Sequence, residues 1–371
     1  MEYAPNKSSA LKSVEDLRVS YCINPRCQQR RNAVDATLCS ACGTSLLIKD
    51  QYRLLKPLRE LHERDNTEVF ATVNDAGTPK VLKILRNPHL AEMFKREAKT
   101  LQKLHSPSIP YVGEKDYFVI TLDKNNGQEL HCLVMEKIEG QNLEQWLEQN
   151  EPISQDVAFK WLEELTIILD LLHQTKRFHR DIKLSNIMRR PDSTLVLIDF
   201  GSVRQTSTTY KIKYKTDLGI TSIVSAGYSP TEQINGKGMP ISDFYALGCC
   251  FVHLLTGVHP LDLRDNPQTG KLEWRYLVPK VGAQLINLID DLIEPIPERR
   301  PRDTQEILHR LKNDNVMSQI KRNIRRTPSL HWVIGLNIVL LVANLVTGIL
   351  SIPPRLNPPQ VPVLEEPLKA L

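Results

Sequence analysis

The alternation of apolar and polar residues predicts secondary structure most clearly between residues 68 and 104. Apolar residues alternate through EVFATV, the turn sequence DAG follows, and a second apolar run surrounds Lys83. This pattern is typical of a β-hairpin whose second strand carries a lysine among apolar neighbours. The next segment, FKREAKTLQKL, has helical spacing and carries Glu97 beside its apolar stripe. The residues at helical spacing are Phe94, Ala98, Leu101 and Leu104.

Two polar clusters lie beside apolar segments farther along the chain. Residues 178–188, FHRDIKLSNIM, set His179, Arg180, Asp181, Lys183 and Asn186 close together and end on an apolar pair. The segment TLVLIDFG is typical of a short buried strand that ends at Asp199, and the glycine after it lets the chain turn. An acid at the mouth of a strand can present its carboxylate to a metal ion. Taken alone, residues 178–188 also fit a solvated loop.

The longest apolar stretch lies near the C-terminus. No charged residue occurs from Trp332 to Ile352, and a helix of these residues would span about 32 Å, enough to cross a bilayer. We predict a transmembrane helix over 330–352 after a basic juxtamembrane segment, 313–329. The lysines and arginines before the helix favour a cytoplasmic location for the preceding chain and place the Pro-rich tail, 353–371, across the membrane. A buried helix in a globular domain is the alternative.

One face of the predicted membrane helix carries small and amide side chains. Asn337, Asn344 and Gly348 are seven and four residues apart, which brings them near one face. Such a face could pair with a second copy through hydrogen bonds and close packing, giving a homodimer. Incidental placement of these three residues is the alternative.

Composition bounds the class of protein. The chain has 371 residues, 41% of them apolar, and a formal net charge of +5, far below the charge density of a nucleic-acid-binding tail. Residues 1–20 carry charges throughout and no apolar run, so we expect a flexible segment without a secretory signal peptide. Seven cysteines are too few for a disulfide-built scaffold. We expect the bulk of the chain in the cytoplasm.

Four of the cysteines form two close pairs near the N-terminus. Cys22 and Cys27 make the first pair, and Cys39 and Cys42 make the second. This spacing predicts a four-thiolate zinc ribbon over residues 21–48, whose folding depends on the metal because the segment is too small for a core. Two disulfides or unliganded thiols are the alternative. A redox-sensing role stays open, and no aromatic and basic stripe supports nucleic-acid binding.

Charged and small residues near these cysteines suit such a site. Four thiolates and one zinc ion carry a net charge of −2, which Arg26, Arg30 and Arg31 could offset. Gly43 would ease the turn of the second pair.

Seven short motifs follow one another between residues 52 and 312. They are KVLK around Lys83, the helix with Glu97, HRDIKLSN, DFG, GYSPTEQ, SDFYALG and RRP. In this order they resemble the eukaryotic-type Ser/Thr protein kinase family. With the zinc ribbon and the apolar span, the layout resembles the membrane-anchored four-cysteine kinases of cyanobacteria. The kinase domain would occupy residues 51–312.

The resemblance implies an α+β, bilobal protein-kinase fold. An antiparallel sheet and one helix would form the N-lobe, and the C-lobe would be mainly helical, with the zinc ribbon before them and one transmembrane helix after them. The family transfers phosphate from ATP to protein serine and threonine, with Mg²⁺, or Mn²⁺, as the metal. Lys83, held by Glu97, would then bind the α and β phosphates, while Asn186 and Asp199 would hold two metal ions.

The same resemblance assigns the remaining parts of the reaction. Asp181 would accept or orient the proton of the substrate hydroxyl, and Lys183 would balance the charge of the γ-phosphate. His179 would pack against the DFG turn. For the adenine, Met135 would be the gatekeeper and Glu136 to Ile138 the hinge. The side chains expected to sandwich the ring are those of Val69, Val81 and Met188.

Family members with an arginine before the catalytic aspartate are often controlled by phosphorylation, and Arg180 stands at that position. Ser225 would brace the substrate site. Glu232 with Arg300, and Asp243 beneath the catalytic loop, would be structural supports. The candidate phosphate acceptors are Thr206, Thr208, Thr209, Thr216, Thr221 and Ser222.

The expected glycine-rich loop before Lys83 is missing. Counted back from Val69, its three glycine positions hold His62, Arg64 and Thr67. Glycine serves there because backbone amides must approach phosphates closely. Two hypotheses follow: an active, autophosphorylating membrane kinase, or a pseudokinase that acts as a scaffold with weak nucleotide affinity. The intact reacting groups favour the first.

Overall fold

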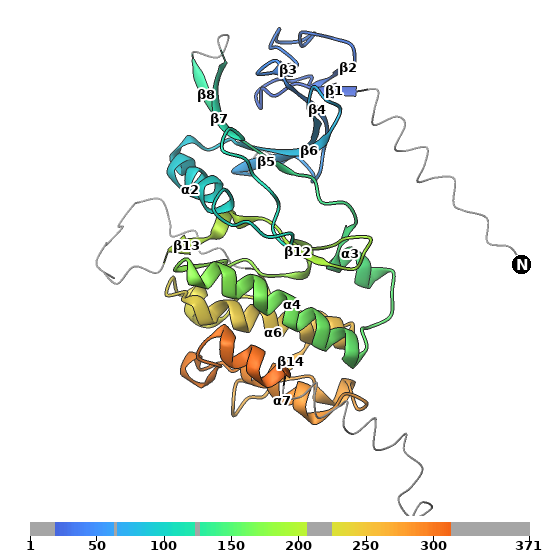
Figure 1. Cartoon of the computed structure of the whole chain (residues 1–371), viewed down its shortest axis with the longest axis vertical. Coiled ribbons are helices and arrows are strands. Elements are labelled where there is room, and N and C mark those ends of the chain that lie inside the picture. Colours follow the sequence, from blue (N-terminus) through green and yellow to red (C-terminus); the bar gives the residue numbers. More distant parts are fainter. Residues whose placement is uncertain (1–18, 63–64, 123–126, 206–224, 313–371) are drawn as a thin grey trace, which may run out of the picture. The chain divides into compact units, whose positions relative to one another are not determined.

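The computed structural model describes residues 19–62, 65–122, 127–205 and 225–312 (Figure 1). Within these residues, no helix has both the length and the apolar character needed to cross a membrane. Several predictions lie outside the described residues. They concern the N-terminal segment up to residue 18, Arg64, the six candidate phosphate acceptors between 206 and 222, and the juxtamembrane segment, membrane helix and tail over 313–371.

A six-stranded antiparallel sheet forms the N-lobe. The predicted hairpin is its centre, with Val69 directly opposite Lys83, because alternating apolar residues place one strand face in a core. In spatial order the strands are β3 Leu47–Ile48, β4 Tyr52–Pro57, β5 Thr67–Val73, β6 Pro79–Leu85, β8 Gln128–Glu136 and β7 Tyr117–Leu122.

Helix α2, Ala91–Leu101, packs against this sheet (Figure 1). Phe94, Ala98 and Leu101 are buried on it as predicted. The prediction that Leu104 continues the helix is wrong: the helix ends at Leu101, and Leu104 reaches the same core from the following loop. An apolar residue after a helix can keep helical spacing because the core, not the helix, sets which residues are buried.

The C-lobe is built on two long helices that lie side by side, α4 and α6 (Figure 1). The hydroxyl of Ser154 accepts a hydrogen bond from the backbone N–H of Val157 and caps α4. Gly257, in the left-handed conformation with φ 70°, ends α6. The helices after α2 are α3 Leu143–Glu148, α4 Gln155–Gln174, α5 Thr231–Ile234, α6 Pro240–Thr256 and α7 Ala283–Leu292, and residues 304–312 are also helical.

Short strands and 3-10 turns carry the polar clusters. The order β12-β11-β9 makes a small sheet, and β10 pairs with β13. The short strands are β1 Val19–Tyr21, β2 Arg31–Ala33, β9 Gln141–Asn142, β10 Arg177–Phe178, β11 Ile187–Arg189, β12 Leu195–Leu197, β13 Arg204–Gln205, β14 Arg264–Asp265 and β15 Leu272–Glu273. The 3-10 turns are η1 Pro88–Leu90, η2 Leu184–Asn186, η3 Phe200–Ser202, η4 Pro260–Asp262, η5 Arg275–Leu277 and η6 Pro297–Arg299.

The four-cysteine segment joins the N-lobe sheet directly. Its last residues form β3, which pairs with β4 as the edge strand of the six. Ile23, 1% exposed, packs into the sheet core on the face away from α2. Arg53 of β4 donates to the carbonyl oxygen of Ala36 at 2.8 Å. These contacts fix the segment to the sheet instead of leaving it on a linker.

Candidate active site and metal centre

Three predicted residues from distant parts of the chain meet at one point. The Lys83 ammonium lies 2.8 Å from Glu97 Oε1 and 2.8 Å from Asp199 Oδ1. Lys83 comes from β6, Glu97 from α2 and Asp199 from the turn after β12. The side chains of Lys83 and Glu97 are almost completely buried, whereas that of Asp199 is 36% exposed. The exposed carboxylate is therefore the one that a metal ion could reach.

Charge and backbone conformation fix this group. Burial alone would lower the pKa of Lys83, but the negative charges of Asp199 and Glu97 have the larger combined effect and hold this pKa above its usual value. The Lys83 charge in turn holds the pKa of Asp199 well below its usual range. Asp199 has a left-handed backbone, φ 62°. A Cβ at Gly201 would lie 3.0 Å from Lys83 Nζ, so a side chain there would crowd the ammonium group.

The catalytic-loop candidates surround Asp181. The Asn186 amide donates to Asp181 Oδ2 at 2.9 Å, and Lys183 Nζ lies 3.2 Å from the same oxygen. The Ser225 hydroxyl donates to Asp181 Oδ1 at 2.5 Å and accepts from Lys183 at 3.3 Å. The backbone N–H of Ile198 donates to Asn186 at 2.9 Å, which ties this cluster to the turn that carries Asp199.

A buried carboxylate supports the loop from below. Asp243 of α6, 1% exposed, accepts from the backbone N–H groups of His179 and Arg180 at 2.8 Å each. Its Oδ2 also contacts the His173 ring at 2.9 Å. Arg180 has φ 72°, a conformation that costs free energy and needs such support. Asp243 lies where the sequence predicted a structural support.

The His179 side chain is fully buried and packs against another ring. Its ring meets Phe200 edge to face at a centroid distance of 5.0 Å. Burial lowers the pKa of His179, which favours the neutral ring. This geometry matches the predicted packing against the DFG turn.

One supporting residue was missed by sequence reasoning. Gln233, 2% exposed, donates to the backbone carbonyl of Arg180 at 2.7 Å. Its position inside GYSPTEQ gave the only available signal. The neighbouring pair is the predicted one: Arg300 Nη1 donates to Glu232 Oε1 at 2.7 Å, and the Ser242 hydroxyl donates to the same oxygen at 2.7 Å.

The predicted adenine-contacting residues come from both lobes. Val69 lies on β5, while Val81 of β6 is opposite Met135 of β8. Ile138 follows β8, and Met188 lies on β11. Except for buried Ile138, these side chains are partly exposed.

The side chain of Glu136 has another partner. Its carboxylate forms an ion pair with Arg190 at 2.8 Å, and its backbone N–H donates to the Tyr111 carbonyl at 2.9 Å. Both groups are therefore already engaged within the protein. The ion pair with Arg190 was not predicted, because two residues far apart in sequence gave no pattern.

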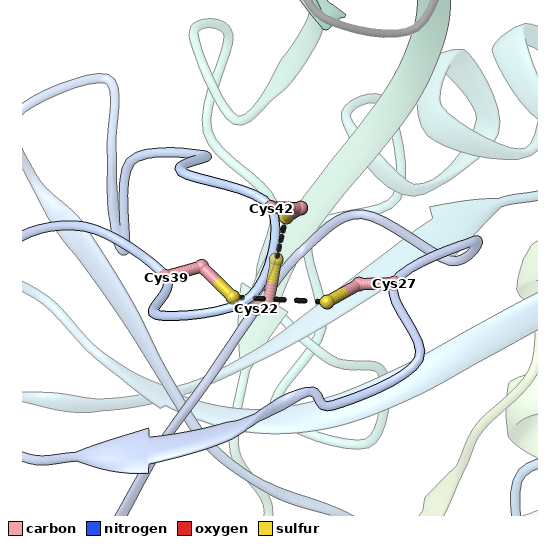
Figure 2. Close-up of side chains that lie close together, drawn as sticks. All are labelled: Cys22, Cys27, Cys39 and Cys42. Carbon is pink, nitrogen blue, oxygen red and sulfur yellow. Dashed lines mark hydrogen bonds between the residues drawn. The ribbon is translucent and has the colours of Figure 1, made fainter.

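The four cysteines converge as predicted (Figure 2). Cys22 Sγ lies 3.5 Å from Cys42 Sγ, and Cys27 Sγ lies 3.7 Å from Cys39 Sγ. All four sulfurs lie within 4.8 Å of one another, close to the spacing of about 3.8 Å between ligands around tetrahedral zinc. Both distances are far above the length of about 2 Å of a disulfide bond. The site could hold one metal ion.

Local structure prepares this cluster. Gly43 has φ 68°, and its N–H donates to the Cys39 carbonyl at 2.8 Å, as expected for a turn that aims two thiols together. Burial opposes the charged form of Cys42, yet hydrogen bonds led by Thr44 outweigh it and lower the pKa of that thiol to about 6. Burial raises the pKa of Cys22. A bound cation would favour the thiolate of every cysteine here.

Arg30 has a different partner from the one predicted. Its guanidinium forms two parallel bonds with the Glu68 carboxylate of β5, at 2.9 and 2.8 Å, and its Nε donates to the Cys22 carbonyl at 2.9 Å. The guanidinium also lies over the Phe70 ring. Glu68 is only 2% exposed. The Arg30 guanidinium is therefore paired with this buried carboxylate and not with a thiolate.

Comparison with known proteins agrees with this geometry. The protein kinase domain model matches residues 65–318, more than half of the chain. The chain belongs to the protein kinase family. It is 32% identical over 324 residues to Serine/threonine-protein kinase B of Synechocystis sp., covering 84% of this chain and 54% of that protein. It is 33% identical over 279 residues to Serine/threonine-protein kinase PknA of Nostoc sp., covering 72% and 48%.

A shorter match involves Serine/threonine-protein kinase F of Synechocystis sp., 35% identical over 221 residues, or 58% of this chain and 44% of that one. The chain thus spans about half the length of these curated kinases.

The family uses ATP with a divalent metal, and the residues present fit both. Asp199 offers a partly exposed carboxylate. The amide nitrogen of Asn186 is bonded to Asp181, which leaves its amide oxygen for a cation. Carboxylate and amide oxygens are the ligands that Mg²⁺ prefers, and Lys83 adds a fixed positive charge for phosphate.

Proposed function

We propose that this protein transfers the γ-phosphate of ATP to serine and threonine hydroxyls of other proteins. The observation that carries the proposal is the Lys83 ammonium, 2.8 Å from both Glu97 and Asp199. This contact aligns a cation for phosphate beside a carboxylate for metal. Membership of the kinase family supports the same reaction.

The proposed roles follow from the charge that must be held. Phosphoryl transfer needs positioning and electrostatic stabilisation more than covalent chemistry. Lys83 binds the α and β phosphates, while Asp199 and Asn186 hold the metal. The bound Mg²⁺ or Mn²⁺ supplies positive charge to the phosphate oxygens.

Asp181 orients the substrate hydroxyl. Its Oδ2 is held by Asn186 and Lys183, so Oδ1, already bonded to Ser225 at 2.5 Å, faces the site where the alcohol enters. The Lys183 ammonium, 29% exposed, stands ready to balance the charge of the γ-phosphate. Both side chains bond to Ser225, so the three form one unit that accepts an aliphatic hydroxyl.

Transfer of labelled phosphate tests the proposal. The full chain in detergent is incubated with Mg²⁺, labelled ATP and a generic basic protein, beside an Asp181→Ala control. We expect label on the basic protein with the parent and none with the control. A parent that binds ATP but transfers no label would instead support the scaffold hypothesis, which the glycine-free turn before Lys83 keeps open.

We also propose that the four cysteines bind one structural zinc ion. The support is the cluster of four sulfurs and the absence of a sizeable core of the segment's own, since only Leu46 joins Cys22 and Cys39 there as a buried apolar residue. Metal analysis of the full chain should give one zinc per chain, and Cys39→Ser should lose it. Cys132→Ser, in the sheet core, serves as the control. Full zinc retention by Cys39→Ser would contradict a four-thiolate site.

For the C-terminal part we propose a single-pass membrane anchor over residues 330–352, with the kinase domain in the cytoplasm. The support is the uncharged stretch and the basic residues before it. Deleting 330–352 should move the protein from the membrane fraction to the soluble fraction. A full chain that is soluble without detergent would contradict the anchor. A mixed-tag pull-down from detergent tests the homodimer.

Autophosphorylation belongs to the same proposal. Arg180 directly precedes Asp181, and the segment from 206 to 222 holds the six candidate acceptors named above. Mass spectrometry after incubation with ATP should find phosphate within this segment in the parent and none in Asp181→Ala. Phosphate restricted to other parts of the chain would contradict this form of control.

A further inference from the structure

The turn between β4 and β5 has an unexpected first residue. Pairing of the two strands runs to Pro57 opposite Phe70, and the Leu58 N–H still donates to the Val69 carbonyl at 2.8 Å. The turn therefore begins at Arg59. The family's glycine positions, counted back from Val69, begin at His62. Arg59 lies before them, so the motif did not indicate it. Arg59 thus stands where the chain leaves the sheet.

A hydrogen bond holds Arg59 across the mouth of the turn. Its Nη2 donates to the Thr67 carbonyl at 2.5 Å and to the Thr67 hydroxyl at 2.6 Å. These bonds occupy one of the three guanidinium nitrogens, and a guanidinium has five N–H donors in all. Among the residues that the structure describes, no carboxylate forms an ion pair with Arg59. Donors and charge therefore remain for an anion.

The sheet register sets the side of the turn on which the guanidinium lies. Thr67 and Val69 are two residues apart on β5, so their side chains share a face. Val69 is directly opposite Lys83, and opposed residues of an antiparallel pair also share a face. The Thr67 hydroxyl, and the Arg59 group bonded to it, are thus on the face of the sheet that carries Lys83.

We propose that Arg59 binds the β- and γ-phosphates of ATP from above and replaces the backbone amides of the missing glycine-rich loop. The proposal rests on ATP being the substrate, as proposed above. A planar guanidinium can bond two phosphate oxygens at once. The long arginine side chain carries the guanidinium to the phosphates. The backbone of the turn therefore need not approach them closely, and the turn needs no glycine. The same charge would stabilise the transferring phosphoryl group.

Binding measurements on the full chain test this role. Arg59→Ala should weaken the affinity for Mg²⁺–ATP about 10- to 100-fold, as expected for loss of a charge-assisted hydrogen bond. Its affinity for adenosine, which has no phosphate, should stay within about twofold of the parent. Arg59→Lys should retain part of the ATP affinity because the charge remains. Arg302→Ala, at an arginine that is 87% exposed in the C-lobe, is the matched control and should bind both ligands like the parent.

Three results would overturn the proposal. Unchanged ATP affinity in Arg59→Ala would show that the guanidinium does not touch the phosphates. Tighter ATP binding would show that Arg59 blocks the cleft. An equal loss of ATP and adenosine affinity would show that it only supports the turn.

The outcomes separate this proposal from the kinase proposal. If the parent transfers phosphate and Arg59→Ala binds ATP normally, the kinase function stands and the role of Arg59 fails. If the parent transfers nothing but its ATP affinity depends on Arg59, the phosphate-binding role stands and the catalytic proposal fails.

Discussion

The floor and the roof of the proposed nucleotide site are fixed in different ways. By the floor we mean the catalytic loop, residues 178–188, and by the roof the turn between β4 and β5. Backbone N–H groups of the floor bond to Asp243, which is 1% exposed. The roof is held by arginine side chains that bond to backbone carbonyls, exposed Arg59 to Thr67 and partly buried Arg86 to His62.

The difference reflects what each side must do. In the proposed reaction, the floor holds groups that exchange a proton or bind metal, where an error of about 1 Å is costly. Hydrogen bonds from the loop backbone to a buried carboxylate hold these groups in place with the required accuracy. The roof needs only to place positive charge near phosphate oxygens, and a long side chain can do this from several backbone conformations. The roof can therefore lose its glycines while the floor keeps the family's motif.

The largest expected effect is at the floor. Asp181→Asn should reduce the rate of phosphoryl transfer by about 10²- to 10⁴-fold, because the amide cannot take the proton of the alcohol. ATP affinity should change little, since Asp181 orients the alcohol. Single-turnover transfer and ATP binding, measured on the same samples, separate the two. A rate within tenfold of the parent would show that the floor is less demanding than its geometry implies.

A second effect concerns the support of the roof. Arg30→Ala would leave Glu68, 2% exposed, with Arg86 at 3.6 Å as its remaining ion-pair partner among the described residues. Breaking a buried pair costs about 3 kcal/mol, and chemical unfolding should show this loss. Arg26→Ala, at an exposed position of the same segment, should lose less than about 0.5 kcal/mol. Equal losses in both variants would mean that the contact does not stabilise the N-lobe.

A smaller effect is expected at the substrate side of the floor. Ser225→Ala removes one hydroxyl that bonds to Asp181 and Lys183. The loss of about 1 kcal/mol corresponds to roughly fivefold slower transfer, while Ser225→Thr should keep the bonds and the rate. Steady-state kinetics with the basic protein substrate give the comparison. If Ser225→Thr were as slow as Ser225→Ala, side-chain size would matter there instead of the hydroxyl.

A further effect, on stability and not on rate, is a pH dependence at His253 of α6. Burial, with help from the neighbouring His259, lowers the pKa of His253 to about 4. The unfolded chain then binds more protons than the folded one between about pH 6.5 and 4. Stability from this residue is present above pH 6.5 and is lost as the pH falls through that window.

Denaturant unfolding at pH 7 and pH 5 measures this loss. His253→Gln should show a smaller difference between the two pH values than the parent, since it has no ring to protonate. The Tyr228 hydroxyl bonds to His253 at 2.7 Å, so the variant is compared with itself at the two pH values, not with the parent at one. An unchanged difference would assign the pH dependence to other groups.

Local patterns were enough for most of the floor. HRDIKLSN holds Asp181, Lys183 and Asn186 within six residues, so their proximity follows from chain length alone. The hairpin and α2 were likewise predicted from periodicity, apart from Leu104. The cysteine cluster followed from spacing, because two short turns suffice to bring two pairs together.

Contacts between distant segments were not predictable in the same way. Nothing near Arg30 in sequence indicates Glu68, and nothing near Arg190 indicates Glu136. The roles of Arg59 and Gln233 were missed for the same reason. Each depends on how strands and loops come together after the chain has folded.

By itself, the sequence determined which chemical groups this protein has and how the nearby ones are spaced: a lysine on a strand, an acid on a helix, a polar loop, an acid before a glycine and two cysteine pairs. Only the tertiary structure decided the partners of Arg30, Arg59 and Arg190. An arginine reaches several ångströms in many directions at little cost, and burial on one particular sheet face selects a single partner.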